Sequence, residues 1–377
     1  MTWIVESRGK TMMIKVINNW KDFELLKPVW QTLLQQSDAD NIFLTWEWID
    51  CWQKTRVEDV KPFIIVIENA NEVVAIAPFY LQNYRLVKTL NYRALRFLGD
   101  QSSGSEYSNF IVKKEGCLEL KEQLWRYLLN QDTNFNWDFI WFVNVSSWTQ
   151  GGKTLLQALA KVDELHCHSR TVEFSQVNIN QLPEDILPIL SKSLRTNIRQ
   201  TGRRLDKLGP WEIEVVDHTF DIQDELEQLF LLHNKHWQNA GGGTFQRRPE
   251  LASFYRSFVP LALERGWLKL LRLKSEGVVQ AMQLGYVYNN RFLAIQEGYN
   301  PEFLPGVGQV LRHFSYMHCQ NEGIDEYDFL GIYTDHKRRW LAEKQLGENL
   351  FIWQNKLKNM PFRIKEIWPT GRYLTPA

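Results

Sequence analysis

The amino-acid sequence predicts a mixed α/β fold (α+β, with a mixed sheet) that occurs twice in the chain. The first observation is a repeated order of elements: strand, two helices, three strands, helix, strand, helix, strand. The second is the run of three successive strands, which favours antiparallel pairing because short turns such as 69–71 join them. The third is the later alternation of strands with helices, which favours parallel neighbours near the end of each sheet.

Apolar periodicity gives the elements of the first half in order. Regular patterning begins near Met12. Strands are expected at 12–17, 62–69, 72–82, 106–112, 137–145 and 171–179. Helices are expected at 20–36, 45–55, 116–130 and 152–162.

The second half opens with two expected helices, 183–192 and 193–208, and then repeats the order of the first half. Its strands are expected at 211–217, 267–277, 278–288, 291–299, 326–332 and 349–355. Its further helices are expected at 221–237, 250–266, 308–323 and 335–345. We therefore predict one domain over 12–180, a second over 181–357 with a helical lead-in at 183–208, and a tail over 358–377.

Composition narrows the class of protein. A length of 377 residues suits two domains, and 44% hydrophobic with 23% charged residues is typical of globular proteins. A net charge of zero and a pI near 7.1 argue against a general nucleic-acid-binding protein. No apolar run is long enough to span a membrane, so membrane insertion is not expected.

The four cysteines are scattered, which is typical of reduced thiols and favours a cytoplasmic location. His166, Cys167 and His168 lack a second ligand pair at zinc spacing, so no metal site is predicted.

Four segments of the second half resemble a known family. The resemblance to the GNAT acyltransferases extends over about 180–345, and within them to the CelD/BcsL-type N-acyltransferases of bacterial cellulose and exopolysaccharide loci. The segments that carry it are SKSLRTNIRQTGRRLDKLG (191–209), LHNKHWQNAGGGTF (232–245), GYNPEFLPGVGQVLRHF (298–314) and EYDFLGIYTDHKRRW (326–340). A weaker match in the first half rests on FLTWEWIDCW (43–52) and FLGDQSSGSEYSNFIV (97–112). The tandem arrangement also resembles the FemABX peptidyltransferases, which use aminoacyl-tRNA.

Gly306 and Gly308 lie at the start of the helix predicted at 308–323. A helix N-terminus offers unpaired N–H groups, and glycines let that backbone approach a phosphate closely. The resemblance implies that the pyrophosphate of acyl-CoA, with acetyl-CoA as the candidate donor, binds the amides of Gly306, Val307, Gly308 and Gln309. Phe303 stands where the family has Arg or Gln, and the alternative is a plain turn before a helix.

Acyl transfer to an amine needs a group that removes a proton. Glu297 is the first candidate, because it lies near the end of a strand where the next parallel strand should splay away. Partial burial there would raise its pKa. His336 and Asp335 are further candidates for proton transfer, and the resemblance assigns Lys337 to phosphates or substrate anions. Each of these residues could instead be an ordinary surface residue.

The amphipathic segment 191–209 has a basic stripe, in which Arg195 and Arg199 are candidates for binding the cofactor phosphate. A nucleotide sugar, tRNA or solvent alone are the alternatives. The acceptor side has four candidate contacts, namely Trp237, Phe245, Asp328 and Tyr299.

The resemblance thus implies an N-acyltransferase that uses acyl-CoA and a small-molecule amine, plausibly an amino sugar for a cell-surface polysaccharide. The first alternative is an aminoacyl-tRNA-dependent transferase, the only reading in which a nucleic acid is a partner. The second is a non-catalytic tandem scaffold in polysaccharide synthesis.

Overall fold

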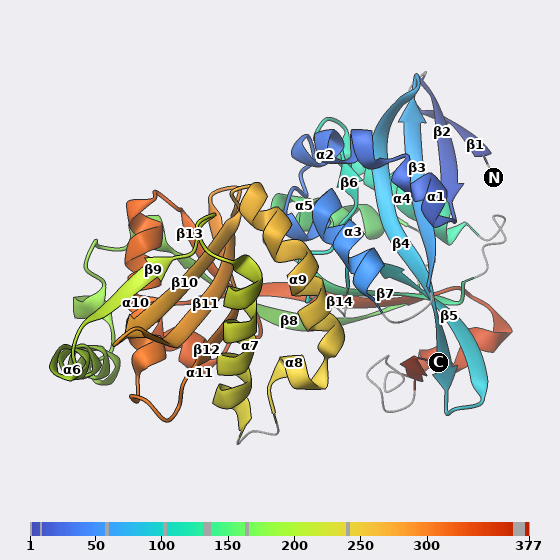
Figure 1. Cartoon of the computed structure of the whole chain (residues 1–377). Coiled ribbons are helices and arrows are strands. Elements are labelled where there is room, and N and C mark those ends of the chain that lie inside the picture. The colour runs from blue at the N-terminus through green and yellow to red at the C-terminus, as the bar shows by residue number, and fades with distance from the viewer. Residues whose placement is uncertain are drawn as a thin grey trace. The chain divides into compact units, whose positions relative to one another are not determined.

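The computed structural model describes residues 2–7, 10–56, 60–100, 104–130, 137–162, 166–238, 242–364 and 374–376 (Figure 1). The chain divides into two compact units. The first unit consists of residues 1–172 and 346–377, and the second unit of residues 173–345.

The first unit is built on a mostly antiparallel sheet. β5 and β7 are its only parallel neighbours among the described strands. The strand order is β1 (Thr2–Ser7), β2 (Lys10–Ile17), β3 (Lys61–Asn69), β4 (Glu72–Leu86), β5 (Leu90–Phe97), β7 (Phe139–Ser146) and the part of β14 (Glu343–Trp353) from Leu346 onward. Two short strands, β6 (Ile111–Val112) and β15 (Leu374–Pro376), pair with β4.

Among the described residues, five α-helices belong to the first unit: α1 (Trp20–Glu24), α2 (Lys27–Gln35), α3 (Trp46–Thr55), α4 (Cys117–Leu129) and α5 (Gln150–Leu159). Aromatic side chains fill the core between the sheet and α4. The rings of Phe79, Phe110, Trp125 and Phe142 pack against one another in edge-on, tilted and stacked pairs. Such rings bury a large apolar area each.

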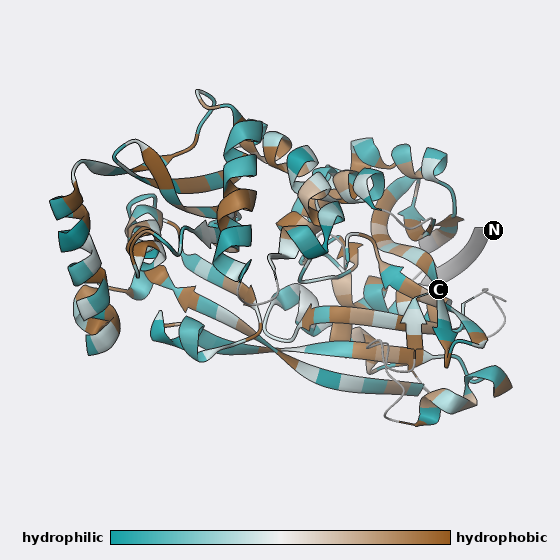
Figure 2. Cartoon of the chain, turned by 60° about the horizontal axis from the view of Figure 1, so that its bottom comes forward, coloured by the Kyte–Doolittle hydropathy of each residue, from teal (hydrophilic) through white to brown (hydrophobic). Residues whose placement is uncertain are grey.

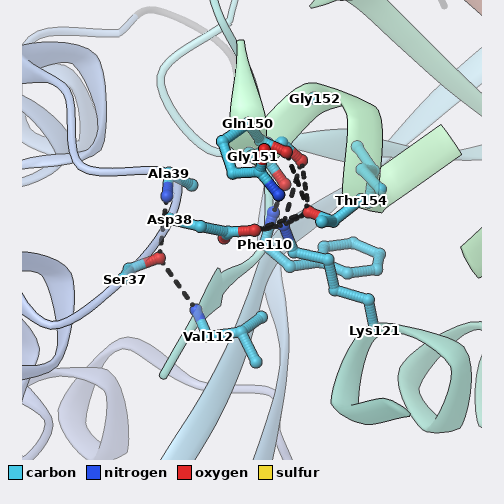
Figure 3. Close-up of polar contacts among 12 residues, drawn as sticks. Ser37, Asp38, Ala39, Phe110, Val112, Lys121, Gln150, Gly151, Gly152 and Thr154 are labelled. Carbon is cyan, nitrogen blue, oxygen red and sulfur yellow. Dashed lines mark hydrogen bonds and ion pairs between the residues drawn. The ribbon is translucent and has the colours of Figure 1, made fainter. Parts of the chain in front are cut away.

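In the first unit, a buried ion pair joins Asp38, which lies between α2 and α3, to Lys121 of α4, and Thr154 of α5 contacts both residues. Figure 3 shows Asp38, Lys121 and Thr154 pointing toward one another. Lys121 Nζ donates to Asp38 Oδ1 at 2.8 Å and to Thr154 Oγ1 at 2.7 Å, as well as to the Gly151 carbonyl at 3.0 Å. Burial lowers the pKa of Lys121, whereas the Asp38 charge opposes that shift. Because the ammonium and the carboxylate are both enclosed, each depends on the other for stability.

The second unit has its own mixed sheet. β12 and β13 are parallel but pair only over Arg291–Leu293 and Glu326–Asp328. The strand order is the part of β8 (His166–Asn178) from Glu173 onward, β13 (Glu326–Gly331), β12 (Arg291–Tyr299), β11 (Val278–Tyr288), β10 (Leu268–Ser275) and β9 (Trp211–Val215). The remaining neighbours are antiparallel.

Helices cover both faces of this sheet (Figure 1). They are α6 (Lys192–Leu208), α7 (Ile222–Trp237), α8 (Thr244–Arg247), α9 (Pro249–Glu264), α10 (Val307–Asn321) and α11 (Asp335–Arg339). On one face Phe258 of α9 packs against Tyr286 of β11, with ring centroids 5.2 Å apart. On the other face Phe292 shares a core cluster with Val307 and Leu311 of α10, and α6 packs onto α10.

The two halves of the sequence exchange strands, so the two units have other bounds than the predicted domains. The end of β8 belongs to the second unit, although we placed 171–179 in the first domain. The strand expected at 349–355 lies in β14 and pairs with β7 of the first unit, although we placed it in the second domain. Each half of the sequence therefore supplies the last strand of the other half's sheet.

Several elements differ from the sequence-based expectation. β5 was not expected. It is the third of the three successive antiparallel strands, a position that we had assigned to 106–112. The helix expected at 183–192 is only a 3₁₀ turn at Leu187–Ile189, because Pro188 in the middle of the segment removes a backbone N–H donor. The helix expected at 335–345 stops at Arg339, and β1 extends the pairing to residues before Met12.

Candidate active site

A pocket of about 530 Å³ lies in the second unit at the place where β12 and β13 separate. The parallel pairing ends at Leu293, and β12 continues for six residues beyond it. The end of β12, the start of α10, the end of α7 and the segment before α11 line this pocket. The lining residues are His236, Trp237, Met282, Gln283, Glu297, Gly298, Tyr299, Gly306, Gly308, Gln309, Leu311, Arg312, Thr334 and His336.

The glycine turn forms the start of α10, as the sequence predicts. Gly306 is the N-cap in a left-handed conformation with φ of 90°. A Cβ at this residue would lie 2.7 Å from Thr201 Oγ1 and 2.8 Å from Asn197 Oδ1. Only glycine therefore allows α6 to pack so closely against the turn.

The amides of the turn differ in their availability. The Val307 amide donates to the Leu304 carbonyl at 3.3 Å, and the Gln309 amide donates to the Gly306 carbonyl at 2.9 Å. Within the described residues the Gly308 amide has no hydrogen-bond acceptor. Because Gly308 also lines the pocket, its N–H is the donor best placed for an anion there.

Glu297 and His336 are brought together by a residue that we did not predict, Arg312 of α10. Its guanidinium forms an ion pair with Glu297, and its Nη1 donates to His336 Nε2 at 2.9 Å. The rings of Phe329 and Trp340 lie 5.6 Å and 5.4 Å from its central carbon. Arg312 is buried, so these contacts fix one orientation of its planar group.

The electrostatics of Glu297 differ from our expectation of a raised pKa. Burial does raise the pKa, but the charge and hydrogen bond of Arg312 outweigh it, and the pKa is lowered overall. Glu297 is therefore a stable carboxylate.

His336 is neutral in this arrangement. Arg312 can only donate, so Nε2 of His336 must be the unprotonated, accepting nitrogen. Partial burial of the ring and then the positive charge of Arg312 lower the pKa of His336. Its accepting lone pair is thus already occupied.

Two histidines of α7, one turn apart, face the same region. His233 Nδ1 donates to the Glu297 carbonyl at 2.8 Å, and its Nε2 accepts from the Thr244 amide at 3.3 Å, so both nitrogens are occupied. A Cβ at Gly298 would lie 2.4 Å from the His233 backbone nitrogen, so this glycine lets α7 cross β12 closely. His236 lies against the Tyr299 ring, with centroids 3.9 Å apart.

The acceptor-side candidates separate in the structure. Trp237 and Tyr299 line the pocket. Phe245 is buried among Phe230, His233 and Tyr255, and it lies outside the pocket lining.

Asp328 is also buried outside the pocket lining, where it accepts hydrogen bonds from the Gln176 side chain and the Leu330 amide.

The two other candidates from the 335–337 segment also lie outside the pocket lining. Asp335 is 88% exposed and pairs with Arg338. Lys337 Nζ donates to the carbonyls of Phe329 and Leu330 at the end of β13. Of this cluster, His336 reaches the pocket, and so does Thr334, the N-cap residue of α11.

The basic stripe of α6 lies mainly on the side away from α10. Bands of hydrophilic and hydrophobic residues alternate along this helix (Figure 2). Leu194, Ile198, Thr201 and Leu205 are buried, so Arg199 and Arg203 fall on the opposite side by helical geometry.

The two predicted arginines of α6 have different surroundings. Arg195 Nη1 donates to the Pro188 carbonyl at 2.8 Å, whereas Arg199 is exposed. Neither lines the pocket.

Sequence reasoning missed several pocket residues, among them Arg312, His236 and Gln283. Arg312 and His236 occupy positions on helices whose facing could not be assigned in advance. Gln283 is 3% exposed, donates to the Tyr327 hydroxyl and leaves its Oε1 buried without a partner in the described part of the chain. The i, i+3 spacing of His233 and His236 was the available signal, because it places both on one helix face.

No helix among the described residues is long and apolar enough to cross a membrane. His166 and His168 lie against the Trp353 ring, and no group of three or more potential metal ligands occurs in the described ranges.

The part of the chain that forms the pocket is similar to a known family. Residues 192–338 match the sequence model of a family described as an acetyltransferase (GNAT) domain. That range contains the glycine turn, Glu297, Arg312 and the histidines of the pocket. No curated protein was found to be similar to this chain in sequence.

Solved structures share the fold of the whole chain at low sequence identity. FemX has a TM-score of 0.58 at 13% identity, covering 86% of this chain and 95% of FemX. L-PGS from Bacillus licheniformis has a TM-score of 0.52 at 12% identity, covering 93% and 96% of the two chains. A conserved protein of unknown function from Bacteroides thetaiotaomicron has a TM-score of 0.51 at 12% identity, covering 87% and 97%. The predicted fold class, mixed α/β with tandem GNAT units, is confirmed.

Proposed function

We propose that the second unit is a GNAT-type N-acyltransferase that moves an acyl group from acyl-CoA to an amine. One observation supports this most directly: a single pocket contains both the glycine turn of α10 and the Glu297–Arg312–His336 cluster. The glycine turn is suited to an anionic acyl donor. The cluster places the Glu297 carboxylate in the same pocket, where an amine acceptor would react.

The donor would bind at the start of α10. The free Gly308 amide and the positive end of the helix dipole favour a pyrophosphate there. The thioester would then extend into the gap between β12 and β13, where strand pairing has ended. Phe303, which stands in place of the family's polar residue, packs against the apolar core and would not bind the phosphate.

The acceptor would enter beside Trp237 and Tyr299, which both line the pocket. Aromatic walls of this kind suit a sugar ring. We therefore propose an amino sugar as the acceptor, and polysaccharide precursors of the CelD/BcsL type as its source.

Calorimetry tests the donor, and mass spectrometry tests the transfer. We expect acetyl-CoA or a longer acyl-CoA to bind the full chain at one site, and glucosamine incubated with it to gain the mass of the acyl group. Absence of binding for every acyl-CoA tried would overturn the proposal.

A second candidate function is aminoacyl transfer from charged tRNA. It is favoured by the outer side of α6, where Lys192, Arg199 and Arg203 are exposed and form no ion pair with any described residue. Such cations suit a polyanion, whose binding should weaken steeply with salt. Replacing all three by Ser should abolish tRNA binding in a filter assay, and it should leave acetyl-CoA binding unchanged if the first function is correct.

A further inference from the structure

His236 has an environment unlike that of the other two histidines near Glu297. It lies in the last turn of α7, and its ring packs between the Tyr299 ring, at 3.9 Å, and the Trp237 ring, at 4.8 Å. His233 uses both of its nitrogens, and His336 accepts from Arg312. Neither nitrogen of His236 has a hydrogen-bond partner among the described residues.

The two nitrogens of His236 differ in burial. Nδ1 is enclosed and unpartnered, whereas Nε2 is not enclosed and belongs to a residue that lines the pocket. In a neutral imidazole one nitrogen carries the proton and the other accepts, so Nε2 is the acceptor in the tautomer whose proton lies on Nδ1. Nδ1 has no described partner in either tautomer, and Nε2 is the nitrogen that a ligand can reach.

We propose that His236 Nε2 accepts the proton of the attacking amine in the acyl transfer, an inference that rests on the proposed function. The amine nitrogen bonds to the thioester carbonyl carbon, and the carbon–sulfur bond breaks. The amine proton passes to Nε2 and is returned to the departing thiolate. The products are the amide and free coenzyme A, and no other reactant is needed.

The charges around His236 suit this role. Burial lowers its pKa most, the Glu297 carboxylate of β12 raises it, and His233 of α7 and Arg312 of α10 lower it slightly. The other titratable groups at this pocket are Tyr299 and His336. A ring that is neutral at pH 7 can accept a proton, and the nearby carboxylate stabilises the imidazolium that forms.

Glu297 and Arg312 are positioning residues in this scheme. Arg312 anchors the carboxylate, and the Glu297 carbonyl anchors His233 one helical turn before His236. The ion pair thus fixes the end of α7 relative to β12.

The test compares His236→Gln with His218→Gln, an exposed histidine outside the pocket. Transfer is followed with acetyl-CoA and either glucosamine or hydroxylamine, a small surrogate amine. We expect His236→Gln to lose about 10²- to 10⁴-fold in kcat while its acetyl-CoA affinity stays within about twofold. The wild-type rate should show an acid limb below the ordinary pKa of histidine, in addition to any limb from protonation of the amine itself, and that limb should be absent in His236→Gln.

Each outcome of this test is decisive. A His236→Gln variant that keeps the wild-type rate and acid limb overturns the role of His236 and leaves the proposed function standing. Failure of the wild type to bind acetyl-CoA, or binding without transfer to either amine, overturns the proposed function instead. His236→Asn serves as a second variant if circular dichroism shows that the first is misfolded.

Discussion

Glu297 and Arg312 make the stability of the second unit depend on pH. The pKa of Glu297 is lowered in the folded state, because Arg312 lowers it by more than burial raises it. Such a carboxylate stabilises the fold above its unfolded pKa, about 4.3, and this contribution is lost as pH falls through the folded value.

We therefore expect the free energy of unfolding to fall below about pH 5 more steeply in the wild type than in Glu297→Gln. Urea titrations at a series of pH values would measure this. Glu302→Gln, an exposed neighbour, is the matched control and should follow the wild type. Equal slopes for the wild type and Glu297→Gln would contradict the prediction.

Asp38 and Lys121 give a second prediction, for the first unit. Asp38→Ala would leave the Lys121 ammonium buried without its counter-charge. We expect a loss of about 3–5 kcal/mol in stability, measured by urea unfolding.

Replacing both partners by apolar residues, as in Asp38→Leu with Lys121→Met, should recover part of that loss. If the Asp38→Ala variant is as stable as the wild type, the ion pair contributes nothing to the fold.

Single residues show where sequence reasoning stops. The position of Glu297 followed from a strand that outlasts its parallel neighbour, and the structure places it in the pocket. Its lowered pKa could not be predicted, because Arg312 approaches from a helix fifteen residues later. The facing of a helical side chain depends on tertiary packing, which local pattern does not specify.

At the scale of elements, the start of α10 offers a matched comparison with the start of α4. Gly306 and Gly116 are both left-handed N-caps, with φ of 90° and 73°. A Cβ at Gly306 would crowd Thr201 and Asn197, whereas a Cβ at Gly116 would meet nothing within 4 Å.

We expect Gly306→Ala to weaken acetyl-CoA binding at least tenfold, about 1.4 kcal/mol, in calorimetry. Gly116→Ala should cost only backbone strain, on the order of 1–2 kcal/mol, and leave that affinity unchanged. Similar affinities for the two variants would show that the glycine turn does not hold the donor.

The facing of α6 gives another prediction. Arg204 lies two helical turns after Asn197 on the side next to the glycine turn, whereas Arg199 points away from it. We expect Arg204→Glu to raise the KM for acyl-CoA several-fold and Arg199→Glu to leave it unchanged. The reverse pattern would favour our original assignment of Arg199.

Most elements could be predicted from periodicity, and the exceptions have physical causes. The 183–192 segment has helical spacing of apolar residues, but the internal Pro188 interrupts a helix there. The segment 90–97 lacks a simple alternation because both faces of β5 are largely buried toward its end. The helix expected at 335–345 was predicted too long, because its last residues, from Glu343 onward, belong to β14.

At the scale of the whole molecule, the exchange of β8 and β14 decides which fragments can fold. Residues 173–345 contain every strand of the second sheet, whereas 181–357 lacks the strand that pairs with β13.

We expect fragment 173–345 to give a dispersed NMR spectrum and fragment 181–357 to aggregate through the exposed edge of β13. Equally good spectra for both would mean that the exchanged strand is dispensable.

The exchange also has a consequence for synthesis on the ribosome. The second unit has all of its strands once residue 331 has emerged, but β7 of the first unit waits for residues 346–353. The half that is translated first is therefore the half that is completed last, and until then its unpaired edge is the part of the nascent protein most in need of chaperone protection.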